Sequence, residues 1–119
     1  MTRTNRIHLQ VAYAATRDIN RQAIYYREQQ DELLAERWLD AVYSEIESLK
    51  IAPERGALCH FSSPNALNLR RVPVTSFPRH LIFYEFLAHS RLLRVRRIAH
   101  GARDLETLIA SPTNPPDNP

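Results

Sequence analysis

Two long apolar segments separated by only four residues constrain the fold of this chain more than any other feature of its sequence. Residues 81–87 (LIFYEFL) are apolar on both alternating faces, which is typical of a central strand covered on both sides. Residues 92–98 (LLRVRRI) are also strand-like, and the four residues between the two segments have the length of a hairpin loop. The sequence therefore predicts a β-hairpin in the middle of a sheet.

A single apolar stripe indicates a helix upstream of this hairpin. Four apolar side chains recur at helical spacing, with charged residues off the stripe: Trp38, Val42, Ile46 and Leu49. Pro53, followed by Gly56, predicts that the helix ends there.

An earlier helix is indicated as well, with Thr16 or Asp18 as its N-cap. One of its faces is predicted to carry Ile19, Ala23 and Tyr26. The polar residues 28–31 predict the joint between the two helices. We therefore expect a helical hairpin over about residues 17–52.

Two further segments are predicted to add strands to the sheet. Residues 7–13 alternate between apolar and polar side chains, as a half-buried strand does. Residues 69–74 predict another strand, in which Pro73 suggests an edge position or a bulge. The composition of residues 54–66 indicates a loop, and residues 76–79 indicate a turn.

The end of the chain predicts one short helix and a tail. Asp104 can cap a helix at residues 105–109, and residues 111–119 hold four prolines, which predicts a disordered tail. The element order is then βααβββ plus a short C-terminal helix. This order predicts an α+β fold, an antiparallel β-sheet with an N-terminal helical hairpin packed on one face.

The composition predicts one soluble globular domain. The chain has 119 residues, of which 44% are hydrophobic and 24% charged, unlike a disordered chain. Its one cysteine, Cys59, cannot form an internal disulfide, which suits a reducing cytosol. No window is apolar enough for a membrane span, and the basic start lacks the apolar core of a signal peptide. We expect a cytoplasmic protein with no membrane partner.

The positive charge is concentrated in the second half of the chain. Residues 1–59 carry a net charge of −1 and residues 60–110 a net charge of +5. The basic side chains are fifteen arginines and a single lysine, Lys50. Arginine suits bidentate recognition of phosphate or carboxylate, although a GC-rich genome would also favour it. An anionic or acidic partner is the favoured interpretation.

Strict alternation would divide the arginines of the last strand between two faces. One face would hold Arg94, Arg96, Ile98 and His100, and the other Leu93, Val95, Arg97 and Ala99. If the second face is the core face, Arg97 requires an acidic or carbonyl partner, or a cleft in which its head group reaches water.

The same region holds the residue types that ribonuclease chemistry needs, which are an acid, a base and cations for the phosphate. The candidates are Arg70, Arg71, His80, Tyr84, Arg97, His100 and Arg103. The alternative role of His100 is structural, with its ring bonded to a backbone carbonyl at the turn of Gly101.

Several other classes of site have no sequence signal. There is no Cys-x-x-Cys pair, no His-Glu-x-x-His motif and no Asp-rich loop, so we expect no metal. Two glycines in the whole chain cannot form a phosphate-cradling loop, and no serine-nucleophile elbow exists. We therefore expect no cofactor.

Several motifs together resemble the RelE/ParE superfamily, the toxins of bacterial type II toxin–antitoxin (plasmid stabilisation) systems. The resemblance covers about residues 7–109. The motifs that carry it are AERW at 35–38 with Ile46 and Leu49, PERG at 53–56, LRRVPV at 69–74, LIFYE at 81–85 and RRIAHGARD at 96–104. It implies a βααβββ core and makes residues 1–110 one toxin domain.

The resemblance also implies partners and two possible activities. A cognate antitoxin would wrap the toxin and neutralise it, and the complex would bind operator DNA through the antitoxin. RelE-like members cut mRNA on the ribosome, whereas ParE-like members cause growth arrest by inhibiting DNA gyrase.

The ParE branch is favoured because the helical hairpin is long, no aromatic residue follows His100–Asp104, and Lys50 lies in a helix. A ribosome-dependent mRNA endoribonuclease is the alternative. The partner-binding candidates are Arg94, Arg96, Arg97 and Arg103.

Overall fold

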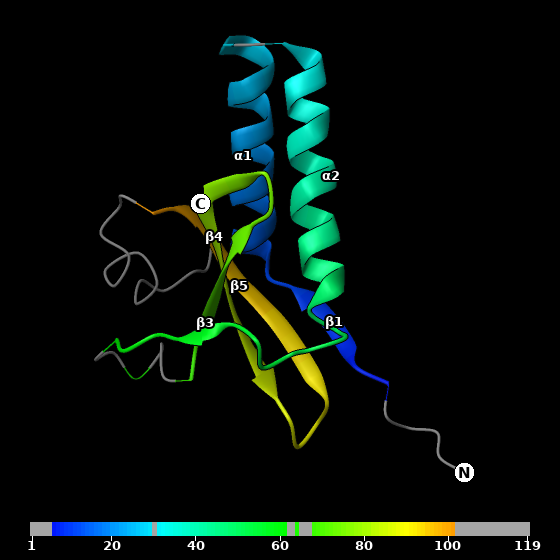
Figure 1. Cartoon of the computed structure of the whole chain (residues 1–119), viewed down its shortest axis with the longest axis vertical. Helices are drawn as coiled ribbons and strands as arrows, with labels where there is room; N and C mark the ends of the chain where they lie inside the picture. Colours follow the sequence, from blue (N-terminus) through cyan, green and yellow to red (C-terminus); the bar gives the residue numbers. More distant parts are fainter. Residues whose placement is uncertain (1–5, 30, 62–63, 65–67, 102–119) are drawn as a thin grey trace.

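The computed structural model describes residues 6–29, 31–61, 64 and 68–101. A first strand and two helices near the N-terminus are followed by the other strands of one sheet (Figure 1). In chain order the elements are β1 (His8–Val11), α1 (Tyr13–Gln29), α2 (Glu32–Ser48), β2 (Ala57–Leu58), β3 (Arg70–Val74), β4 (Phe77–Leu87) and β5 (Leu92–His100). The predicted α+β class is confirmed.

The five strands form one mixed sheet in the order β1-β5-β4-β3-β2. β4 is the central strand and pairs antiparallel with both β5 and β3, as the apolar segments predict. One pairing is parallel, because β1 lies beside β5 with His8 opposite Leu92. The sheet is therefore mostly antiparallel, with one parallel strand at its edge.

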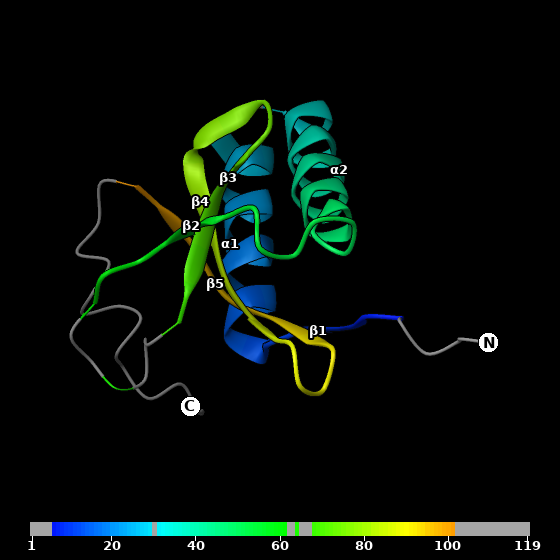
Figure 2. The same ribbon diagram turned by 60° about the horizontal axis from the view of Figure 1, so that its bottom comes forward.

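The helical hairpin covers one face of this sheet (Figures 1 and 2), and Figure 1 shows that the end of α1 and the start of α2 extend beyond the strands. α1 packs on β5, while α2 reaches β3 and β4. Every side chain of the predicted stripe of α2 is buried, and so are Ile19 and Ala23 of α1. The Trp38 indole Nε1 donates to the Ile19 carbonyl oxygen at 3.0 Å, which ties the two helices together inside the core.

A smaller apolar cluster covers the opposite face of the sheet. It contains Cys59, Leu69, Phe83 and Ala99, with Phe61 and Leu81 packed against it. This second cluster explains why the sequence of β4 is apolar on both faces. Neither helix within the described residues has the length and apolar character needed to cross a membrane.

The helix boundaries differ from those predicted. α1 begins at Tyr13, so neither Thr16 nor Asp18 is its N-cap. Asp31 is the cap of α2, since its Oδ1 accepts from the Leu34 N–H at 2.7 Å. α2 ends at Ser48, before Pro53, in a tightened turn in which three successive N–H groups bond three residues back.

The strand boundaries also differ in two places. The predicted loop at residues 54–66 contains the two-residue strand β2. β4 begins at Phe77, inside the predicted turn, and the turn itself lies at Thr75 and Ser76, where Ser76 has a φ of 78°. The register shifts beside Pro73, as the expected bulge requires. The predicted last helix and the proline-rich tail lie outside the described residues.

Candidate functional site

Arg97 is an internal structural residue of the fold. Its Nε and Nη2 donate to the two carboxylate oxygens of Asp18 in α1 at 2.8 and 3.0 Å. The same carboxylate accepts the Ile98 N–H at 2.9 Å. β1 pairs with β5 only as far as Val95, so Asp18 occupies the edge of β5 where no neighbouring strand continues. The acidic partner expected for Arg97 is therefore present.

A β-bulge changes the predicted distribution of the arginines. Tyr84 pairs with Val95 and Phe83 with Arg97, so Arg96 is the extra residue of β5. As a result, Ile98 joins Val95 in the core under the helices, while Ala99 joins the cluster on the opposite face. The strict alternation was therefore wrong beyond Val95, because one unpaired residue reverses the side-chain order.

The partner-binding candidates Arg94 and Arg96 lie beside Glu85 of β4. Arg94 Nη1 is 2.7 Å from Glu85 Oε2, and Arg94 Nε donates to Gln10 of β1 at 2.7 Å. Arg96 Nη1 is 3.9 Å from the other oxygen of Glu85. These arginines join three adjacent strands and keep part of their surface exposed. Arg103 lies outside the described residues.

Arg70 and Tyr84 form a second internal arrangement around Gly56. The buried Tyr84 hydroxyl accepts the Gly56 N–H at 2.9 Å, and Arg70 Nη1 donates to the carbonyl oxygens of Gly56 and Glu54 at 2.8 and 3.0 Å. Burial raises the pKa of the Tyr84 hydroxyl. A Cβ on Gly56 would lie 2.7 Å from the Tyr84 oxygen, so this close approach requires glycine.

Arg71, Arg55 and the thiol of Cys59 lie outside these two arrangements. Arg71 is exposed on β3, near Cys59, and burial raises the pKa of the Cys59 thiol, which opposes a nucleophilic role. Arg55 contacts Glu45 of α2 at 2.7 Å, and Glu45 also accepts the Thr75 N–H at 2.9 Å. Burial works against ionisation of Glu45, but Arg55 and Thr75 outweigh it and lower its pKa.

His80 and His100 are a second pair of candidates that the fold brings together. They are opposite each other on β4 and β5, with ring centroids 5.3 Å apart. The His80 ring is buried against Trp38 at 4.6 Å, with Tyr26 and Phe77 nearby. Within the described part of the chain, neither ring nitrogen of His80 has a hydrogen-bond partner. Burial, with the neighbouring His100, lowers the pKa of His80.

A cleft opens beside this histidine pair. Its volume is about 680 Å³, and its lining residues are Gln22, Tyr25, Tyr26, Phe77, Pro78, Arg79, His80 and His100. The sequence identified the two histidines but not the side chains of α1 or Arg79. The adjacent tyrosines at 25 and 26 were the available signal, but only the tertiary fold places them beside the start of β4.

Burial of neutral His80 predicts a loss of stability in mild acid. An unfolded histidine titrates near 6.5 and native His80 titrates lower, so the unfolded chain binds more protons as the pH falls through that value. We expect the free energy of unfolding to fall below pH 6.5, by at most about 1.4 kcal/mol per pH unit for this group. Denaturant titrations between pH 5 and 8 measure this slope.

The variant His80→Phe retains an aromatic ring and should flatten the slope. His89→Gln, in the exposed loop between β4 and β5, is the matched control and should leave it unchanged. A slope that is the same in His80→Phe and in the unmodified chain would contradict this account.

Known structures share this fold. A chain of the chromosomal ParDE TA system from P. aeruginosa superposes with a TM-score of 0.66 at 12% identity, covering 82% of this chain and 98% of that one. A mutant of the E. coli toxin RelE in the free state gives a TM-score of 0.57 at 11% identity, covering 88% and 94%. No curated protein sequence matches the chain. At these identities the structures define the fold alone, an α+β fold with two helices packed on one sheet.

The family follows from the sequence match. The model of the ParE toxin of the type II toxin-antitoxin system parDE matches residues 9–105, so the chain belongs to the ParE toxin family. The predicted superfamily and branch are confirmed, and a ParDE system implies a cognate antitoxin as partner. Among the described residues, no cluster of His, Cys, Asp or Glu side chains could hold a metal ion.

Proposed function

We propose that this toxin arrests growth by inhibiting DNA gyrase through protein contacts, and that its cognate antitoxin neutralises it. One observation carries the proposal. Three of the residues that RNA cleavage would need are engaged inside the fold, since Arg97 is bound to Asp18, and Arg70 and Tyr84 are bound around Gly56. The two arginines donate to acceptors within the fold, and the Tyr84 hydroxyl accepts the Gly56 N–H. These groups therefore have little capacity left to hold a phosphate.

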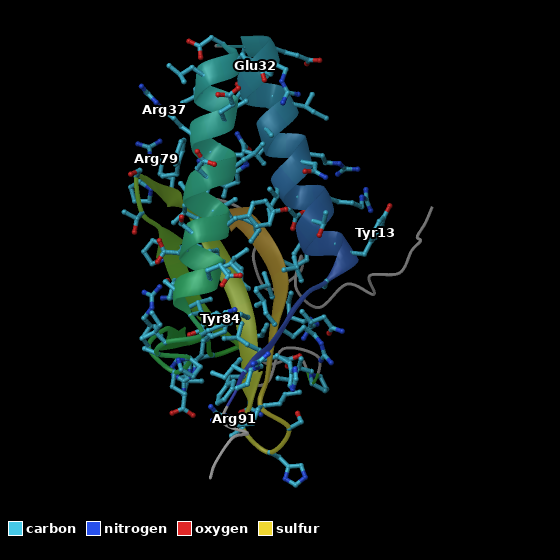
Figure 3. All side chains as sticks on the ribbon, turned by 90° about the vertical axis from the view of Figure 1, so that its right-hand side faces the viewer. Tyr13, Glu32, Arg37, Arg79, Tyr84 and Arg91 are labelled. Atoms are coloured by element: carbon cyan, nitrogen blue, oxygen red, sulfur yellow. The ribbon has the colours of Figure 1, made fainter. Side chains whose placement is uncertain are left out.

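The spacing of the candidates supports the same conclusion. Tyr84 and His80 are four residues apart on one strand, which separates them by about 13 Å. Figure 3 shows Tyr84 and Arg79 well apart along the length of the molecule. General acid–base catalysis requires both groups within hydrogen-bond reach of one reacting centre. The tyrosine therefore cannot act with the histidine pair on one phosphate.

The ribosome-dependent endoribonuclease remains the second candidate, and one observation favours it. His80 and His100 lie 5.3 Å apart beside a cleft that also has Arg79 on its wall. An imidazole that is neutral at pH 7 can accept a proton, and a guanidinium can stabilise the charge on a phosphate. In this alternative the cleft, and not Arg70 or Tyr84, would hold the RNA.

We propose that the antitoxin also regulates the module. The antitoxin would hold the toxin and would also carry the contacts to operator DNA. Residues 60–110 of the toxin, which carry a net charge of +5, would then be bound by acidic side chains of the antitoxin.

Plasmid topology in arrested cells tests the proposed target. We expect induction of the toxin to relax plasmids, because gyrase supplies negative supercoils, and co-expression of the antitoxin to restore them. Chloroquine gels measure the topoisomers, and mapping of mRNA ends in the same cells is the control. Cleaved mRNA with unchanged plasmid topology would favour the endoribonuclease.

A further inference from the structure

We propose that the cleft between α1 and the start of β4 is an anchor site for an acidic segment of the cognate antitoxin. An aromatic or large aliphatic side chain of that segment would enter the cleft, and a neighbouring carboxylate would pair with Arg79. The inference rests on the proposed function, because it takes the antitoxin as the partner.

The walls of the cleft suit an apolar anchor. Tyr26, Phe77 and Pro78 supply ring surfaces, and Tyr25 stands at the rim with 55% of its surface exposed. The volume of about 680 Å³ lies within the roughly 300–1,000 Å³ of typical ligand sites. Tight protein interfaces bury aromatic side chains in pockets of this kind, and these contacts carry most of the binding energy.

His80 provides a second, independent indication of a binding site. This residue is 7% exposed and belongs to the cleft wall, yet neither ring nitrogen has a hydrogen-bond partner within the described residues. Buried polar groups are nearly always satisfied, and an unsatisfied one costs about 1–3 kcal/mol. An unsatisfied polar group at the edge of a cleft is more typical of a binding site than of an apolar core.

The charge of the cleft selects an acidic partner. Arg79 is exposed, and among the described residues it forms no ion pair, in contrast to Arg94, Arg97 and Arg55. Among the residues that the structure describes, none that lines the cleft is acidic. A smaller hollow of about 330 Å³ adjoins it and shares Pro78, Arg79 and His100, so Arg79 lies between the two. A carboxylate beside the anchor can therefore reach this guanidinium.

The same features distinguish a peptide from a nucleic acid. Nucleic-acid binding requires several cations along a phosphate backbone, and its affinity falls steeply with salt. Within the described residues, the cleft offers a mainly aromatic wall with one arginine and a histidine pair. That chemistry fits a side-chain anchor with one neighbouring charge. Gyrase could present similar groups, and the test below separates it from the antitoxin.

The experiment measures the affinity of the full-length toxin for its purified antitoxin by calorimetry. The cleft variants are Tyr25→Ala and Arg79→Glu, at exposed positions where folding should persist, which thermal melts verify. The matched controls are Tyr43→Ala, an exposed tyrosine on α2, and Arg6→Glu, the same charge change just before β1. We expect each cleft variant to weaken binding at least tenfold and each control by less than threefold.

The possible outcomes separate this inference from the proposed function. If the unmodified toxin binds antitoxin and both cleft variants bind within threefold of it, the anchor site is overturned and the toxin assignment stands. If the variants keep antitoxin affinity but no longer inhibit gyrase, the cleft belongs to gyrase and the inference is also overturned. If the unmodified toxin shows no antitoxin binding, the proposed function itself fails.

Discussion

Replacing Asp18 by alanine is expected to destabilise the toxin by about 3 kcal/mol, a drop in Tm of roughly 15 °C for a domain of this size. The carboxylate accepts two hydrogen bonds from Arg97 and one from the Ile98 N–H. Its removal leaves a largely buried guanidinium and a backbone donor without their acceptor. Thermal and urea unfolding, followed by circular dichroism, measure the loss.

Two variants show whether this effect is specific. Asp40→Ala removes an exposed aspartate from α2 and should change stability by less than about 0.5 kcal/mol. Asp18→Asn keeps an acceptor for the Ile98 N–H and should lose less than Asp18→Ala. Equal and small losses of stability for Asp18→Ala and Asp40→Ala would show that the ion pair between Asp18 and Arg97 does not stabilise the fold.

The variant Trp38→Ala is expected to lose about 4 kcal/mol, because it removes the largest side chain of the core and leaves a cavity. The indole also donates to the Ile19 carbonyl oxygen, and this hydrogen bond holds the helical hairpin closed. Since small domains are stable by only about 5–15 kcal/mol, this loss removes a large part of the total stability. Urea titration at 25 °C measures the change.

The control variants for this prediction are on the same helix. Tyr43→Ala removes an exposed ring and should cost less than about 1 kcal/mol, while Trp38→Phe, which loses only the hydrogen bond and part of the ring, should fall between the two. A Trp38→Ala protein as stable as Tyr43→Ala would contradict the placement of this tryptophan in the core.

The parts of the fold that follow from local periodicity could be predicted from the sequence. The stripe of Trp38 and the two apolar segments on either side of residues 88–91 each lie within one continuous segment. The parallel pairing of β1 with β5 could not be predicted, because it joins His8 to Leu92 across most of the chain. No local sequence pattern predicts such a contact.

The same limit applies to the candidate site. The sequence identified Arg97 as a residue that needed an acidic partner, but Asp18 was interpreted as a helix cap, since its local context suits both roles. One bulged residue, Arg96, then reversed the expected faces of the strand end. The cleft combines α1, β4 and β5, so its aromatic wall became visible only in the folded chain.

A supercoiling assay tests directly our proposal that this toxin acts by contact with gyrase and not by cleaving RNA. Purified toxin is titrated into a DNA gyrase supercoiling reaction with relaxed plasmid and ATP, with and without an excess of antitoxin. We expect toxin alone to block the appearance of supercoiled plasmid and antitoxin to restore it. Unimpaired supercoiling at saturating toxin, by a preparation that still arrests growth when expressed, would contradict it.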